Sequence, residues 1–189
     1  MLIMDSDHGV ESAEAFGSTA TVVPVTDSRK LDEVYEWLRD EAIPAGEFTW
    51  VWWDSLTLFQ DRTLLDEITL DAHLANPEKQ SPDVPSQREY LIDHNRVKRY
   101  VRMFVDLPIN FGISFHVGTQ EDPDTEEIIY MPAVQGKGMS SAVCGYLNVV
   151  GFLSQVKVEG QKATVPKILF RQNPKWYARD RFNALPGVM

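Results

Sequence analysis

A run of bulky apolar residues from Phe48 to Trp53 ends abruptly in Asp54 and Ser55. A central strand of a parallel sheet is covered by helices on both faces, so its sequence is continuously hydrophobic instead of alternating. The run therefore predicts a buried central strand whose carboxyl end presents polar side chains. In folds that contain such strands, strands and helices alternate along the chain.

Three further apolar segments have the lengths of strands, and amphipathic segments separate them. The expected strands cover residues 2–4, 21–25, 48–53 and 109–117, and the expected helices cover residues 28–43, 56–74 and 87–106. This alternation implies right-handed crossovers and a mainly parallel sheet. Pro24 favours a sheet edge because it cannot donate to a strand ladder. Asp27 or Ser28 is expected to cap the first helix by accepting from its free amides.

The pattern changes after residue 120. Short extended segments and a glycine-containing loop follow, and residues 146–158 are expected to pair with residues 162–170. Antiparallel strands added at one edge of the parallel sheet are the simplest arrangement. We expect a single domain over residues 1–189, with residues 172–189 as a candidate C-terminal tail.

Composition narrows the class of protein. The chain is 43% hydrophobic, but no stretch reaches the roughly 18 apolar residues of a membrane helix, and the N-terminus has no signal-peptide pattern. We therefore expect a soluble, cytoplasmic protein with no membrane partner. The lone Cys144 has no His or Cys neighbour at metal spacing, which predicts a buried, inert thiol.

Charge is distributed unevenly along the chain. The net charge is −10, yet residues 1–95 hold 20 acidic and 6 basic residues, whereas residues 96–189 hold 8 acidic and 12 basic residues. A local basic face can still bind a phosphate backbone by releasing its counterions. Contacts with single-stranded DNA are therefore expected in the second half, and a solvated charged face is the alternative. The candidate DNA-binding residues are Arg96, Lys98, Arg99, Arg102, Lys167 and Arg171.

Polar pairs follow three of the predicted strands: Asp7-His8, Asp54-Ser55 and Thr119-Gln120. Parallel α/β sheets bind ligands beyond the carboxyl ends of their strands, so these pairs are expected to converge on one site. A carboxylate at the position of Asp54 can hold water around Mg²⁺. The alternative is a helix N-cap, because a helix begins directly after Asp54.

The residues at these strand ends resemble those of RecA-like P-loop ATPases. Asp5-Ser6-Asp7-His8 looks like the strand whose acidic end carries the catalytic carboxylate, and the strand ending in Asp54-Ser55 looks like the Walker B element. The similarity is strongest to phage-encoded RecA-like ATPases of single-strand annealing and recombination, and it covers roughly residues 1 to 158. It is also carried by Tyr90, Leu107-Pro108, Thr119-Gln120 and the loop Pro132-Ala133-Val134-Gln135-Gly136-Lys137.

The resemblance implies a three-layer α/β core that binds ATP with Mg²⁺ and acts on single-stranded DNA in recombination or replication. Asp7 would orient and deprotonate the attacking water, and Asp54 with Ser55 would support Mg²⁺ through water. Thr119 or Gln120 would sense the γ-phosphate. Lys137 would reach the nucleotide of a neighbouring subunit as a cation, and a solvated loop lysine is the alternative. The family has Glu where Asp7 stands, so this carboxylate is retracted by about one methylene.

No segment has the Walker A pattern Gly-x-x-x-x-Gly-Lys-Ser/Thr, which cradles phosphates. Gly136-Lys137 fails because Met131 and Gly138 occupy the flanking positions. In the family this loop precedes the strand that matches residues 2–4, so we expect the first strand, the loop and the following helix to lie outside these residues. Two functions stay open. One is an ATPase completed by that loop in a homo-oligomer or with a partner chain, and the other is a non-catalytic DNA- or protein-binding scaffold.

Overall fold

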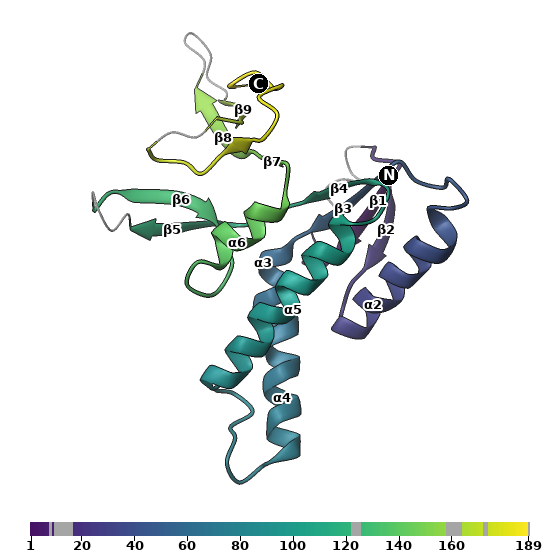
Figure 1. Ribbon diagram of the computed structural model, residues 1–189, viewed down its shortest axis with the longest axis vertical. Helices are drawn as coiled ribbons and strands as arrows, with labels where there is room; N and C mark the ends of the chain where they lie inside the picture. The colour runs from purple at the N-terminus through teal and green to yellow at the C-terminus, as the bar shows by residue number, and fades with distance from the viewer. Residues whose placement is uncertain (8, 10–16, 122–125, 158–163, 172–173, 189) are drawn as a thin grey trace. The chain divides into compact units, whose positions relative to one another are not determined.

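The structure is a computed structural model that describes residues 1–7, 9, 17–121, 126–157, 164–171 and 174–188 (Figure 1). The chain divides into two compact units. The first comprises Met1–His116 and Val134–Met139, and the second comprises Val117–Ala133 and Ser140–Met189. The single domain expected from the sequence stays a prediction.

A four-stranded parallel sheet forms the centre of the first unit (Figure 1). Its strand order is β2-β1-β3-β4, which confirms the predicted mainly parallel α/β sheet. Strand β2 lies at an edge, as Pro24 predicted. The strands are β1 (Leu2–Asp5), β2 (Thr21–Pro24), β3 (Trp50–Asp54) and β4 (Asn110–Ile113).

Three helical segments connect these strands, close to their predicted positions. Each begins at a residue whose side chain accepts a hydrogen bond from a first-turn amide: Asp27, Ser55 and Ser86. In Figure 1, α4 and α5 form a hairpin that projects beyond the sheet. The segments are α2 (Ser28–Trp37) with the π-helical turn η1 (Leu38–Ala42), then α3 (Leu56–Phe59) with η2 (Gln60–Leu64) and α4 (Leu65–Ala75), and finally α5 (Gln87–Val105).

These helices share one face of the sheet. The connections from β2 to β3 and from β3 to β4 step in the same direction, so right-handed crossovers place their helices together. The Tyr35 ring of α2 lies 5.5 Å from the Phe104 ring of α5, which in turn lies 5.7 Å from Trp53 of β3. The core of the first unit therefore sits between this sheet face and the helices. Its fully buried side chains include Leu2, Met4, Leu31, Leu38, Val51, Trp53, Phe59, Val101 and Phe104.

The opposite face of β3 carries Trp50 and Trp52, whose side chains are 45% and 37% exposed. The intervening Val51 and the following Trp53 point to the helical face and are fully buried. The prediction that this strand is covered on both faces is therefore wrong for the described residues. Helices α2, α3 and α5 supply one helical layer, and the third layer of the predicted architecture is not seen in the described part of the first unit.

The strand predicted over residues 109–117 is two strands instead of one. Strand β4 ends at Ile113, and β5 begins at Val117 in a different sheet. The apolar pattern runs through this break: the Ser114 amide still donates to the Trp53 carbonyl at 3.0 Å, and the chain then pairs with β6 (Ile128–Pro132) from Val117 onward. The polar pair Thr119-Gln120 consequently lies within β5, and the prediction that it ends a parallel strand is wrong.

Among its described residues, the second unit contains three two-stranded antiparallel sheets and the helix α6 (Met139–Tyr146), whose first residue belongs to the first unit. The predicted pairing of residues 146–158 with residues 162–170 is confirmed in the ladder of β8 with β9. These strands do not extend the edge of the parallel sheet, so that prediction is wrong. The strand pairs are β5 (Val117–Glu121) with β6 (Ile128–Pro132), β7 (Val149–Val150) with β10 (Arg179–Asp180), and β8 (Phe152–Lys157) with β9 (Thr164–Leu169).

Two smaller predictions concern Cys144 and the C-terminal tail. Cys144 is fully buried, as predicted, and burial raises the pKa of its thiol to about 12. The candidate tail includes β10, which pairs with β7, so part of residues 172–189 is held by a strand ladder. Among the described residues, no helix is both long and apolar enough to cross a membrane.

Candidate functional site

The carboxyl edge of the parallel sheet brings two of the predicted site segments together. Strands β1 and β3 are neighbours, and their register places Asp5 opposite Asp54. The amide of Ser6 then donates to the Asp54 carbonyl oxygen at 2.6 Å, which continues the pairing past the end of β1. The segment that leads to Asp7 is therefore fixed against the end of β3.

Asp54 is a strand-end carboxylate and does not cap the following helix. That helix is capped by Ser55, whose hydroxyl accepts from the Leu58 amide at 3.5 Å. The Asp54 carboxylate instead accepts a hydrogen bond from the hydroxyl of Ser114, which directly follows β4. The peptide bond between Asp54 and Ser55 is cis. Three adjacent strands, β1, β3 and β4, thus contribute polar groups to this edge.

Asp7 lies in the short segment after β1 and is held there by its own backbone contacts. Its amide donates to Asp5 Oδ1 at 3.2 Å, and its carboxylate accepts from the Gly9 amide at 3.0 Å. Desolvation raises the pKa of the Asp7 carboxyl, and the negative charge of Asp54 raises it further. A carboxylate with raised proton affinity is better suited to accept a proton than an isolated aspartate.

The buried indole of Trp53 lies next to this edge, on the sheet face that packs against the helices. Its Nε1 donates to the Ser6 hydroxyl at 2.9 Å, and its ring packs 5.2 Å from Phe59. One hydrogen bond thereby satisfies the only polar atom of a fully buried side chain. Because Ser6 immediately precedes Asp7, the indole also restrains the segment that carries this carboxylate.

The remaining predicted nucleotide-site residues lie elsewhere in the chain. Thr119 and Gln120 are exposed residues of β5 in the second unit, and their role as γ-phosphate sensors stays a prediction. Lys137 is exposed in the loop Val134–Met139, which belongs to the first unit. His8 lies outside the described residues.

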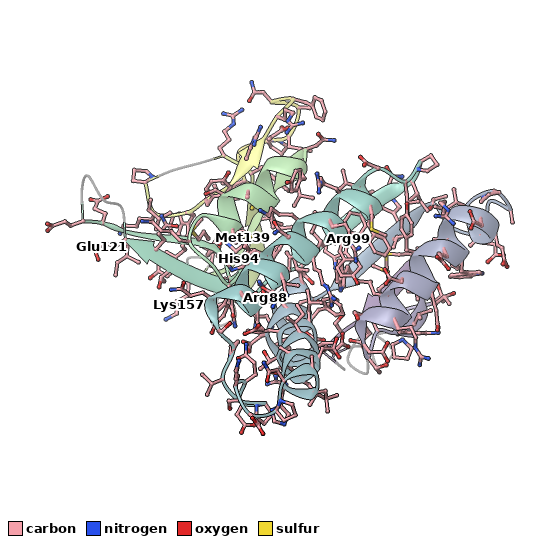
Figure 2. All side chains as sticks on the ribbon, turned by 60° about the horizontal axis from the view of Figure 1, so that its bottom comes forward. Arg88, His94, Arg99, Glu121, Met139 and Lys157 are labelled. Atoms are coloured by element: carbon pink, nitrogen blue, oxygen red, sulfur yellow. The ribbon has the colours of Figure 1, made fainter. Side chains whose placement is uncertain are left out.

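The predicted DNA-binding residues fall into two groups. Arg96, Lys98, Arg99 and Arg102 lie on α5, where Arg99 and Arg102 are exposed and Figure 2 shows Arg99 on the same helix as Arg88. Lys167 of β9 is half-buried, and Arg171 is exposed after that strand, both in the second unit. DNA contact by either group stays a prediction.

Sequence reasoning missed two polar residues that the structure makes important. Ser114 lies inside an apolar run, and only its hydroxyl distinguishes it from the strand residues before it. Gln60 is 1% exposed and hydrogen-bonds the loop that carries Lys137. Its position offered a signal, because residues 56, 60 and 64 follow the helical i, i+4 spacing of the buried stripe.

The residues at this edge suit Mg²⁺ by donor type but do not form a protein cage. Within the described residues, no group of three or more His, Cys, Asp or Glu side chains could hold a metal ion. Mg²⁺ commonly keeps several waters and binds one or two carboxylates together with substrate phosphates. The carboxylates of Asp7 and Asp54 therefore fit an ion held largely by water and phosphate.

Comparison of the sequence with models of known protein families, and with curated proteins, found no match.

Proposed function

We propose that this chain supplies the catalytic carboxylate and the Walker B carboxylate of a RecA-like ATPase that acts on single-stranded DNA in recombination or replication. One observation carries the proposal: Asp54 ends β3 and Asp7 follows β1 at the carboxyl edge of these adjacent parallel strands, where desolvation and then the charge of Asp54 raise the pKa of Asp7. Ligand sites of parallel α/β sheets lie at this edge.

The roles of the two carboxylates differ. Asp7, with its raised pKa, would orient a water molecule and accept its proton as the water attacks the γ-phosphate. Asp54, fixed by the Ser114 hydroxyl, would hold water molecules of the Mg²⁺ shell. The bound Mg²⁺ would neutralise charge on the phosphate oxygens. Ser55 caps helix α3 and thereby keeps the backbone after Asp54 in place.

Hydrolysis in this proposal requires a phosphate-binding loop that the 189 residues lack. The loop would come from a partner chain, because a second copy of these residues lacks it as well. Lys137 would reach the nucleotide of a neighbouring subunit as a cation, and the basic residues of α5 would contact the DNA backbone.

The missing Walker A pattern favours a second candidate function for the chain by itself. A scaffold that binds DNA or protein could retain the parallel sheet and its carboxylates without turning over ATP. The two functions differ in whether Mg²⁺ and nucleotide bind at the edge formed by Asp7 and Asp54.

Tryptophan fluorescence of the chain, titrated with Mg²⁺ and ATP with and without single-stranded DNA, tests the proposal. Trp53 is a suitable reporter because its Nε1 bonds Ser6 beside Asp7. We expect a saturable change that requires Mg²⁺ and weakens at least tenfold in Asp54→Asn and in Asp7→Asn. Asp106→Asn, an exposed aspartate after α5, is the matched control. Nucleotide binding that is equal in all three variants would contradict the proposal, and DNA binding without any nucleotide response would favour the scaffold.

A further inference from the structure

A buried polar pair lies between η2 and α5, away from the strand-end carboxylates. Gln60, the first residue of η2, is 1% exposed, and Asp93 in α5 is fully buried. Polar side chains buried to this degree are retained where hydrogen bonds satisfy them. Gln60 Nε2 donates to Asp93 Oδ2 at 2.6 Å, so the two helical segments share a polar contact inside an apolar core.

The rest of the Gln60 amide binds one residue of the Lys137 loop. Gln60 Oε1 accepts from the Gln135 amide at 2.9 Å, and Gln60 Nε2 also donates to the Gln135 carbonyl at 3.3 Å. Both backbone groups of Gln135 are therefore paired with a single side chain, as in a strand ladder. We name these bonds, together with the bond to Asp93, the Gln60 clamp. Because Asp93 accepts only from the nitrogen, it also fixes which way the Gln60 amide faces.

The loop held by the clamp is buried at both ends and exposed at its tip. Val134 and Met139 are 8% and 4% exposed, whereas Lys137 is exposed. Gly136 has a φ of 108° and packs so closely on His94 that a Cβ atom would lie 2.2 Å from His94 Nε2. Figure 2 shows His94 and Met139, the two side chains that border Gly136. Gly136, Lys137 and Gly138 form the exposed tip, and Lys137 carries the only charged side chain of this loop.

We infer that Gln60 and Asp93 are positioning residues for Lys137, which present its ammonium group in one place for contact with a phosphate group. The inference rests on the proposed function, in which that phosphate belongs to a bound nucleotide. A lysine on an unrestrained loop loses backbone freedom when it binds phosphate, and the clamp removes that loss in advance. The clamp begins at a π-helical turn, an element that occurs frequently at functional sites.

Replacing both Gln60 and Asp93 by apolar side chains distinguishes the loss of the clamp hydrogen bonds from a loss of folding. Gln60→Met with Asp93→Leu removes all the hydrogen bonds of the clamp and leaves no polar side chain of the pair buried and unpaired. The backbone groups of Gln135 lose their partner, but this residue is half-buried and can bond water, so the chain is expected to fold. We expect hydrogen exchange at the Gln135 amide and tryptic cleavage after Lys137 to accelerate at least tenfold. The control Arg62→Gln, exposed on the same turn, is expected to leave both unchanged.

The single variants give a second measurement that a loss of folding cannot imitate. Asp93→Asn keeps an acceptor for Gln60 Nε2 and is expected to retain slow exchange at Gln135, whereas Asp93→Ala is expected to lose it. Equal exchange in the wild type, the double apolar variant and Asp93→Ala overturns the clamp. Fast exchange in Asp93→Asn, equal to that in Asp93→Ala, overturns the positioning role of the carboxyl group.

The affinity for Mg²⁺ with ATP links the clamp to Lys137. Lys137→Ala and the double apolar variant are expected to weaken binding by the same factor, and their combination by no more, because the clamp acts only through the lysine. Additive losses, or a clamp variant with unchanged affinity, contradict the inference. If Lys137→Ala itself binds normally, the positioning role toward nucleotide is overturned. Failure of the proposed function is distinguishable, since it would show as binding that is indifferent to Asp54→Asn.

Discussion

Asp93 is a fully buried carboxyl group, and its surroundings decide when it ionises. Burial raises its pKa from 3.8 to about 6, against the lowering effects of the Gln60 hydrogen bond and of the Arg96 charge. Its Oδ1 has no hydrogen-bond partner among the described residues. The folded chain therefore keeps a proton that the unfolded chain releases above pH 3.8. This contribution to stability is complete below that pH and is lost as the pH rises through about 6.

Asp93→Asn is expected to stabilise the chain near neutral pH. Asparagine keeps the acceptor for Gln60 but carries no charge to desolvate, so the gain should be about 1 to 2 kcal/mol at pH 7.5. The gain should shrink toward zero near pH 4, where wild-type Asp93 is itself neutral. Urea unfolding between pH 4 and 8 measures this difference. A gain that is independent of pH would show that Asp93 is not the titrating group.

Gly136 and Gly138 form a matched pair that separates backbone strain from packing. Both have positive φ, 108° and 73°, but only Gly136 has atoms of His94 where a Cβ would lie. Gly138→Ala should cost about 1 kcal/mol through strain alone, and Gly136→Ala should cost about 2 kcal/mol or more. Thermal unfolding measures both costs. His94→Ala in the Gly136→Ala background should recover part of the loss, and equal costs at both glycines would rule out the His94 contact.

Helix α5 begins with a capping box, in which Ser86 and Glu89 satisfy each other's backbone amides. Hydrogen bonds from Ser86 hold the pKa of Glu89 below its usual range. This depressed pKa stabilises the folded chain above the ordinary pKa of glutamate, and the contribution is lost as the pH falls through the folded value.

Ser86→Ala is expected to destabilise the chain by about 1 kcal/mol at neutral pH, the usual cost of losing an N-cap. Acidification should reduce the difference from the wild type, because protonated Glu89 no longer benefits from the Ser86 bonds. Urea unfolding at pH 7 and pH 3 provides the comparison. Ser81→Ala in the preceding loop is the control, and a loss that is equal in both variants would remove the special role of the cap.

Elements whose signals are local were predictable from the sequence. The three helical segments were found from their apolar spacing and caps, and the parallel sheet followed from their alternation with strands. The break at Ser114 was not predictable, because the same apolar pattern suits β4 and β5 although their partners differ. That the ends of two parallel strands lie at one edge was predictable from the strand pattern, and β1 and β3 do so, whereas the clamp depends on contacts between Gln60 and a residue 75 positions away.

At the scale of the whole molecule, the uneven charge predicts how DNA would bind. The affinity for single-stranded DNA should fall with salt by about 0.7 logarithmic units of affinity per logarithmic unit of salt for each phosphate contact. Replacing Arg96, Lys98, Arg99 and Arg102 by alanine should therefore reduce this slope by up to about 3. Replacing Arg29, Lys30, Arg39 and Arg62 on the earlier helical segments removes the same charge and is the control. Fluorescence anisotropy at several salt concentrations measures the slope for each variant. Equal reductions of the slope in the α5 variant and in the control would show that α5 has no specific role.

The place of β1 in the sheet bears on how quickly the chain can reach its structure. Its partners lie about twenty and about fifty residues further along, since Leu2 pairs with Thr21 and with Val51. Strand pairing over such separations loses loop-closure entropy before the packing contacts that stabilise it have formed, and this slows folding. During synthesis, β1 must therefore wait until β3 has left the ribosome. The edge that carries Asp7 and Asp54 can form only at that stage, after Asp54 itself has emerged.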